Sequence, residues 1–159
     1  MTQFLTALQE SAFSTWLRES ESVLALPTIL TLHTIGLAVL VGPAWVFDLR
    51  VLGMARGIPL APSRTLFRVM WMGLWINVIT GVMLFCADAV RKGASVPFLL
   101  KMGFVLTGAV TVVLLRRHVY GPDSAPEAVS GTAKVLAVVS IVSWTAAISA
   151  GRLLAYVVR

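Results

Sequence analysis

The chain has 159 residues, of which 58% are hydrophobic and only 13% are charged, and its mean hydropathy is +0.88. Soluble globular domains hold about 45–50% apolar and about 25% charged residues, so this composition indicates an integral membrane protein. The net charge of +6 does not point to nucleic acid, because the basic residues stand mostly at the ends of apolar runs, where they anchor membrane helices. The single cysteine, Cys86, excludes an intrachain disulfide and a cysteine metal cage.

Residues 3–19 place apolar side chains mainly along one side at helical spacing. The stretch is too polar to span a membrane, and Trp16 suits the level of the lipid headgroups. The pattern therefore predicts an amphipathic helix that lies in the membrane interface. A short helix on the soluble side is the alternative.

Four apolar runs are long enough to cross a hydrocarbon core of about 30 Å at about 1.5 Å per residue. They predict membrane spans at about 24–47, 69–87, 97–115 and 133–158. The links at 48–68 and 116–131 contain Gly and Pro and predict loops, and residues 88–96 predict a short turn. The expected fold is all-α: a single membrane domain over residues 1–159, built as an antiparallel four-helix bundle with the interfacial helix at its N-terminus.

Lys and Arg residues near the span ends indicate the orientation. The two longer links, together with Lys134, hold seven such residues, and the opposite side holds four. Basic residues favour the cytoplasmic side, so both termini are predicted to lie outside. The expected location is the bacterial inner (cytoplasmic) membrane.

Polar side chains gather in the outer half of this predicted bundle. His33 is the only strongly polar side chain of the first span and lies about 13 Å below its outer edge. Lys101 lies about one turn into the third span, and Arg152 about 9 Å from the same edge. Asp88 and Tyr156 close the second and fourth spans on that side. Titratable groups inside a membrane are costly unless paired, so we expect these residues to face the bundle interior and mark a site.

Three of the spans carry a stripe of polar and small residues that we expect to turn inward, because lipid cannot satisfy polar groups. The stripes are His33, Gly36, Leu37 and Leu40 on the first span, Asn77, Gly81, Leu84 and Asp88 on the second with Thr80 adjoining, and Thr145, Ser149, Arg152 and Tyr156 on the fourth.

A neutral imidazole in an apolar span, with two cations nearer the surface, suits haem b. We expect His33 to ligate the iron and Gly36 to leave room for the edge of the macrocycle. Lys101 or Arg152 would then pair with the haem propionates. The remaining members of the expected cofactor-binding set are Asn77, Asp88 and Tyr156.

The alternative is a polar cluster that only packs the helices. Asp88 would then neutralise Lys101 or Arg152, and His33 would bond to Asn77, Ser149 or Tyr156.

Two further titratable residues lie at the inner ends of spans. His118 follows the third span, too far from His33 for both to ligate one iron. Asp48 is expected to pair with Arg68 or to cap its helix.

Several motifs together resemble an uncharacterised family of small bacterial four-span membrane proteins. They are LHTIGLAVLVG at 32–42, DLRVLG at 48–53, TGVMLFCADA at 80–89, PFLLK at 97–101, and SW and GRLLAY within 143–156. The first-span His followed by Gly and a later Lys is also similar, more distantly, to the four-span haem-binding protoporphyrinogen oxidase of bacteria. That resemblance implies functional roles for His33 and Lys101.

These observations favour a b-type haem protein in electron transfer or a porphyrin-linked oxidation. The alternatives are a small permease or ion-handling protein and a non-catalytic subunit of a larger membrane complex. The expected partners are membrane lipid and other copies of the chain, because the many glycines in the spans favour close helix packing and therefore a homo-oligomer. The sequence contains no catalytic motif that would identify an enzyme.

Overall fold

The computed structural model describes residues 2–20, 24–55, 57–58, 63–120 and 130–157. Within these ranges the structure is all-helical, and four helices are long and apolar enough to cross a membrane. They are α3 (Ala25–Val51), α4 (Ser63–Cys86), α6 (Val96–Tyr120) and α7 (Gly131–Val157). The predicted fold class, an all-α four-helix membrane bundle, is confirmed.

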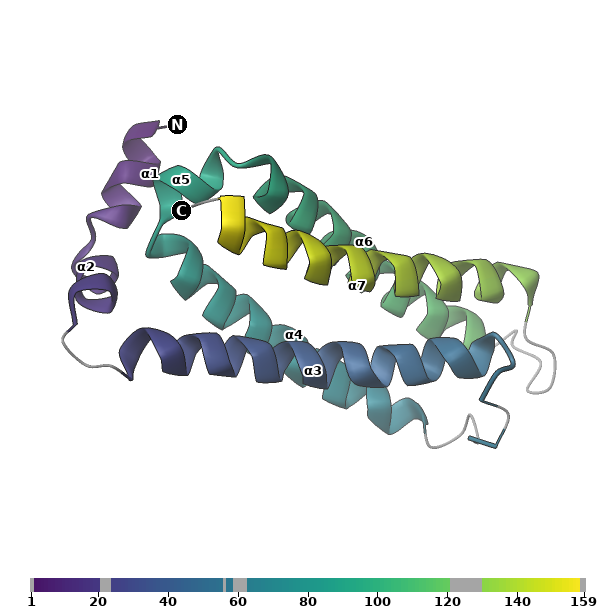
Figure 1. The fold of residues 1–159 in the computed structure, drawn as a ribbon. Helices are drawn as coiled ribbons and strands as arrows, with labels where there is room; N and C mark the ends of the chain where they lie inside the picture. The colour runs from purple at the N-terminus through teal and green to yellow at the C-terminus, as the bar shows by residue number, and fades with distance from the viewer. Residues whose placement is uncertain (1, 21–23, 56, 59–62, 121–129, 158–159) are drawn as a thin grey trace.

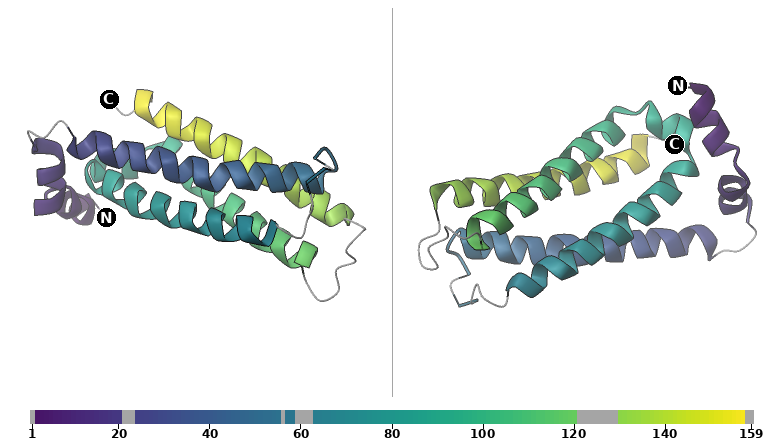
Figure 2. Two further views of the ribbon diagram at one scale, coloured as in Figure 1. Left: turned by 90° about the horizontal axis from the view of Figure 1, so that it is seen from below. Right: turned by 180° about the vertical axis from the view of Figure 1, so that it is seen from behind.

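The four long helices form two hairpins. α3 packs along α4, and α6 packs along α7, while the two hairpins meet mainly through α3 and α7. Figure 1 shows α1 (Thr2–Gln9), the C-terminal end of α7 and the short helix α5 (Ala89–Gly93) at one end of the bundle, and the ends of α3 and α6 with the beginnings of α4 and α7 at the other. Figure 2 shows the same arrangement from below and from behind. We call these the α5 end and the opposite end.

The long helices extend beyond most of the predicted span boundaries. α3 continues to Val51, α4 already begins at Ser63, and α6 continues through the basic stretch to Tyr120. Hydropathy marks where a helix leaves the hydrocarbon, whereas the backbone stays helical for as long as the following residues allow it. Residues 56, 59–62 and 121–129 of the two predicted loops lie outside the described residues.

The N-terminal segment forms two helices instead of the single one predicted. These are α1 (Thr2–Gln9) and α2 (Ala12–Glu19). Ser11 separates them, because its hydroxyl oxygen accepts a hydrogen bond from the Ser14 N–H and thereby caps α2. Both helices attach to the α5 end: Gln9 Oε1 accepts from the Val90 N–H at 3.0 Å, and Leu17 is buried in one cluster with Ile29 and Ala87.

The main hydrophobic core lies toward the opposite end. Phe47, Phe67 and Tyr120 bring three aromatic rings together there, with centroids 5.0–6.3 Å apart. α3 and α4 approach so closely that a Cβ on Gly73 would lie 2.6 Å from the backbone nitrogen of Leu40. Glycine is required at that crossing because the neighbouring atoms are backbone and cannot rotate away.

Candidate functional site

His33 is held on α3 by the neighbouring helix α4. Its Nδ1 lies 2.9 Å from the Thr80 hydroxyl, and its backbone carbonyl accepts a hydrogen bond from the Asn77 amide at 2.8 Å. Thr80 is buried, and Asn77 and His33 are half-buried. The α4 stripe therefore turns toward α3, and two of its members orient the histidine.

The hydrogen bonds of Thr80 determine which nitrogen of His33 carries the proton. The Thr80 hydroxyl donates its only hydrogen to the Ile76 carbonyl at 2.6 Å. Thr80 can therefore only accept from the imidazole, so the His33 proton lies on Nδ1. No described residue forms a hydrogen bond with Nε2, whose lone pair is available to a ligand.

Gly81 provides the surface on which the His33 ring lies. A Cβ built on Gly81 would be 3.4 Å from His33 Cε1, so the ring rests directly on the helix backbone. Gly36 has a different role from the one expected. The space that its Cβ would fill is occupied by Ile76 at 2.7 Å and Asn77 at 3.1 Å, so Gly36 serves the α3–α4 contact and leaves no room there for a macrocycle.

Lys101 on α6 comes close enough to His33 for the two to interact electrostatically. Its side chain lies along α7, and its Nζ would be 3.6 Å from a Cβ on Gly151. Among the described residues, no acidic side chain forms an ion pair with Lys101. The two hairpins thus contribute one group each: an imidazole from α3 and a half-buried ammonium from α6.

Asp88 interacts with a cation other than the two expected. It stands at the start of α5, where Lys92 is its electrostatic partner. Lys92 also donates a hydrogen bond to the Leu84 carbonyl and is close enough to Lys101 for mutual repulsion. Burial lowers the pKa of Lys92, and the charge of Asp88 opposes that shift. We call Lys92, Lys101 and Asp88, together with His33, the α5-end cluster.

Arg152 and Tyr156 do not join this cluster, and the expectation of an inward stripe on α7 is wrong. Both side chains are exposed, Tyr156 at 65% of its surface, as are Thr145 and Ser149. The two hydroxyls donate to carbonyls one turn back on their own helix, Thr145 to Ile141 and Ser149 to Thr145. A hydroxyl satisfied in this way needs no partner in the bundle interior.

Asp48 and His118 lie toward the opposite end. Asp48 is only 1% exposed, and neither expected role is observed: Arg68 is exposed, and Asp48 forms no ion pair with a described residue. α3 continues past Asp48, so that residue does not cap the helix. His118 is exposed and its Nδ1 lies 2.9 Å from the Leu114 carbonyl.

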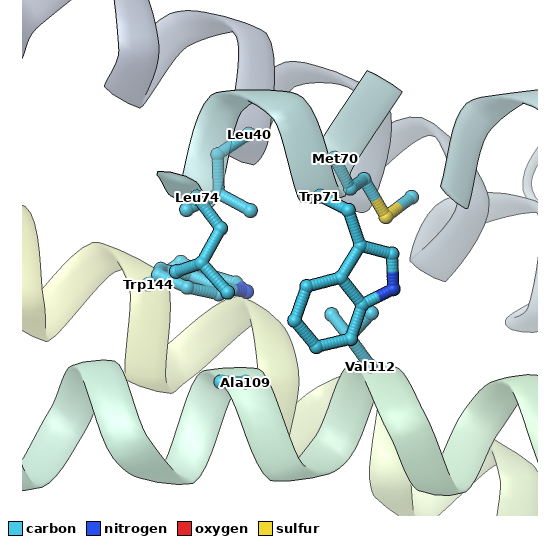
Figure 3. A pocket seen from close by; sticks show the side chains of 7 residues that line it. All are labelled: Leu40, Met70, Trp71, Leu74, Ala109, Val112 and Trp144. Carbon is cyan, nitrogen blue, oxygen red and sulfur yellow. The ribbon is translucent and has the colours of Figure 1, made fainter. Parts of the chain in front are cut away.

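A small apolar pocket lies between all four long helices, and His33 does not line it. Figure 3 shows the indoles of Trp71 from α4 and Trp144 from α7 on its two sides. The residues around it are Leu40, Met70, Trp71, Leu74, Ala109, Val112 and Trp144.

Sequence reasoning missed three contributors to the α5-end cluster and its setting: Thr80 as the partner of His33, Lys92 as the partner of Asp88, and Gly151 beneath Lys101. The sequence pattern places Thr80 beside the inward stripe of α4, but the expected partners of His33 are Asn77, Ser149 and Tyr156, not Thr80. The role of Lys92 depends on the fold of α5, which apolar periodicity does not reveal.

Comparison with known proteins gives a family but no function. No curated protein and no solved structure matches the chain significantly. The model of a family of unknown function, DUF6644, matches residues 9–157, which include all four long helices. The chain therefore belongs to the DUF6644 family.

Proposed function

We propose that this protein binds haem b in the membrane and acts in electron transfer or in a porphyrin-linked oxidation. The observation that carries the proposal is the state of His33. A histidine that donates Nδ1–H to a neighbouring group and leaves Nε2 free has the tautomer and the fixed ring orientation that metal-ligating histidines show. His33 Nε2 is the atom that would ligate the iron.

Two groups near His33 also support the haem proposal. Gly81 lies against Cε1 and Nδ1 of the imidazole, so the ring has no bulky neighbour at that side. Lys101 approaches from the other hairpin, and Lys92 is close enough to Lys101 to interact with it electrostatically. These two ammonium groups would pair with the haem propionates, which are carboxylates. Asn77 would act indirectly, by holding the backbone of His33.

Bound haem would supply one-electron redox chemistry at its iron, and the protein would tune it through the axial ligand and its hydrogen bond. The chain's own residues hold the imidazole in one tautomer, through Thr80, and present cations at one end of the site. The similarity of His33 and Lys101 to the pair in the haem-binding protoporphyrinogen oxidase of bacteria supports the porphyrin-linked version of the function.

We further propose that the protein lies in the bacterial inner membrane with both termini outside, so that the α5 end faces outward. The excess of Lys and Arg in the links of the opposite end supports this orientation. Its electron partner would then be a second copy or another subunit of a membrane complex.

The test is the visible absorption spectrum of the protein purified in detergent after haem supplementation. We expect a Soret band in the wild type, its loss in His33→Ala, and weaker haem retention in Lys101→Met. His118→Ala is the matched control and should retain the band, because His118 lies toward the opposite end. A colourless wild type, or a Soret band unchanged in His33→Ala, would overturn the proposal.

A second candidate is an anion-handling permease, and one observation favours it. Lys92 and Lys101 form a half-buried pair of cations with only Asp88 beside them among the described acids. A colourless protein that carries anions into liposomes, and loses this flux in Lys101→Met, would support the permease. A protein inactive in both assays that co-purifies with fixed partners would support the role of a non-catalytic subunit.

A further inference from the structure

Three buried polar atoms of α3 and α7 have no hydrogen-bond partner among the described residues. They are Asp48 Oδ2, Ser140 Oγ and Trp144 Nε1. Asp48 is 1% exposed and Ser140 is 0% exposed, and the carboxyl of Asp48 lies next to the hydroxyl of Ser140. Unsatisfied buried groups are rare in native proteins, and in membrane helices a buried acid marks a functional site by default.

Among the residues whose side chains are described, no charged group on the elements around Asp48 neutralises it. Arg50 on its own helix donates to the Ile58 carbonyl. The basic residues of the other three helices near this end whose side chains the structure describes are exposed, and none acts electrostatically on Asp48: Arg68 on α4, Arg116, Arg117 and His118 on α6, and Lys134 on α7. An ionised Asp48 would therefore be a buried charge without a counter-charge in the part of the chain that the structure describes, which costs several kcal/mol or more in a site with little water.

We propose that Asp48 is a proton-binding site, in which the carboxyl holds a proton and, once protonated, turns to donate it to the neighbouring Ser140 Oγ. A hard metal cation is a poorer occupant, because such ions take about six oxygen ligands, and the described site offers one carboxyl and one hydroxyl. Asp48 stands three residues before α3 ends at Val51, so the acid is about one turn, or ~4.5 Å, from water at the opposite end. The proton therefore exchanges with the solution on that side.

This site is independent of the proposed haem site. His33 and Asp48 are 15 residues apart on one continuous helix, which is about 22 Å along its axis. Nothing in the proton-binding proposal requires haem, and the test uses the colourless protein as readily as the haem-bound one.

Infrared difference spectroscopy on the detergent-purified protein, between neutral and alkaline pH, tests the proposal. We expect the carbonyl stretch of a protonated carboxylic acid at neutral pH, its loss on deprotonation, and its absence in Asp48→Asn. Asp88→Asn is the matched control and should keep the band, because Asp88 is half-buried and has Lys92 beside it.

A second variant keeps the test decisive if Asp48→Asn does not fold. Ser140→Ala removes the hydrogen-bond acceptor, so the acid band should shift to higher frequency while the band itself remains. No acid band in the wild type at neutral pH, a band that disappears in Asp88→Asn instead, or a band unmoved by Ser140→Ala would each overturn the assignment.

Discussion

The α3–α4 crossing at Gly73 makes the sharpest stability prediction. A Cβ at this position would lie 2.6 Å from the Leu40 nitrogen, 2.8 Å from the Gly36 oxygen and 2.9 Å from the Val39 carbonyl carbon. All three are backbone atoms, so Gly73→Ala can be accommodated only if the two helices move apart. Overpacking of this kind costs about 1–3 kcal/mol.

Gly42→Ala is the matched control, because it introduces the same methyl group in a membrane helix where nothing lies within 4 Å. Both substitutions gain about 1 kcal/mol of helix propensity, and this gain cancels in the comparison. Gly73→Ala should therefore have an unfolding constant about 5- to 140-fold larger than that of Gly42→Ala.

The assay is equilibrium unfolding in mixed micelles with increasing denaturing detergent, followed by far-ultraviolet circular dichroism. If the two variants unfold at the same detergent fraction, then the α3–α4 approach described for Gly73 is not a feature of the folded protein.

Three further predictions use the same purified protein. Arg152→Ala should change the free energy of unfolding by only about 0–1 kcal/mol, because the side chain is exposed. A larger loss of stability in the same unfolding assay would mean that the Arg152 side chain is paired inside an assembly. Burial lowers the pKa of Lys92 from 10.5, so the folded protein binds fewer protons than the unfolded chain below that pH, and the free energy of unfolding should rise with pH up to about 10.5. This rise should be smaller in Lys92→Gln. An unchanged dependence on pH in that variant would contradict the burial of Lys92. The orientation can be tested at two exposed positions, Met54 and Val96, after Cys86 has been replaced. Met54→Cys should resist impermeant thiol reagents in intact cells, whereas Val96→Cys should react with them. The reverse pattern would invert the proposed orientation.

The four-helix architecture could be predicted from sequence because length and apolar character together leave few alternatives. A run of about 20 apolar residues spans the hydrocarbon core, and only a helix satisfies its backbone there. Helix ends were less predictable, since Arg116 and Arg117 end the apolar run without ending the helix. Ser11 divides the N-terminal segment by a local cap that apolar periodicity does not detect.

The candidate site was predictable on α3 and α4 but not on α7. On α4, an amide and a hydroxyl reach another helix, so the polar face turned inward as expected. On α7, Thr145 and Ser149 bond to their own backbone, which removes the reason for burial. The buried face of α7 consists instead largely of small residues and one tryptophan: Ala133, Ala137, Ser140, Ser143, Trp144, Ala147 and Ala150.

The contact between Gln9 and Val90 joins residues that are 81 positions apart in the chain. At about 5–20 residues per second, a ribosome needs about 4–16 s to synthesise the intervening segment. The synthesis of α1 and α2 is complete early in this interval, before α5, on which α1 docks, and Ala87, against which Leu17 of α2 packs, have been made. Their amphipathic faces must be sheltered by the membrane surface or by a chaperone until α4 has been inserted. The docking of α1 and α2 therefore marks the completion of the first hairpin during biogenesis.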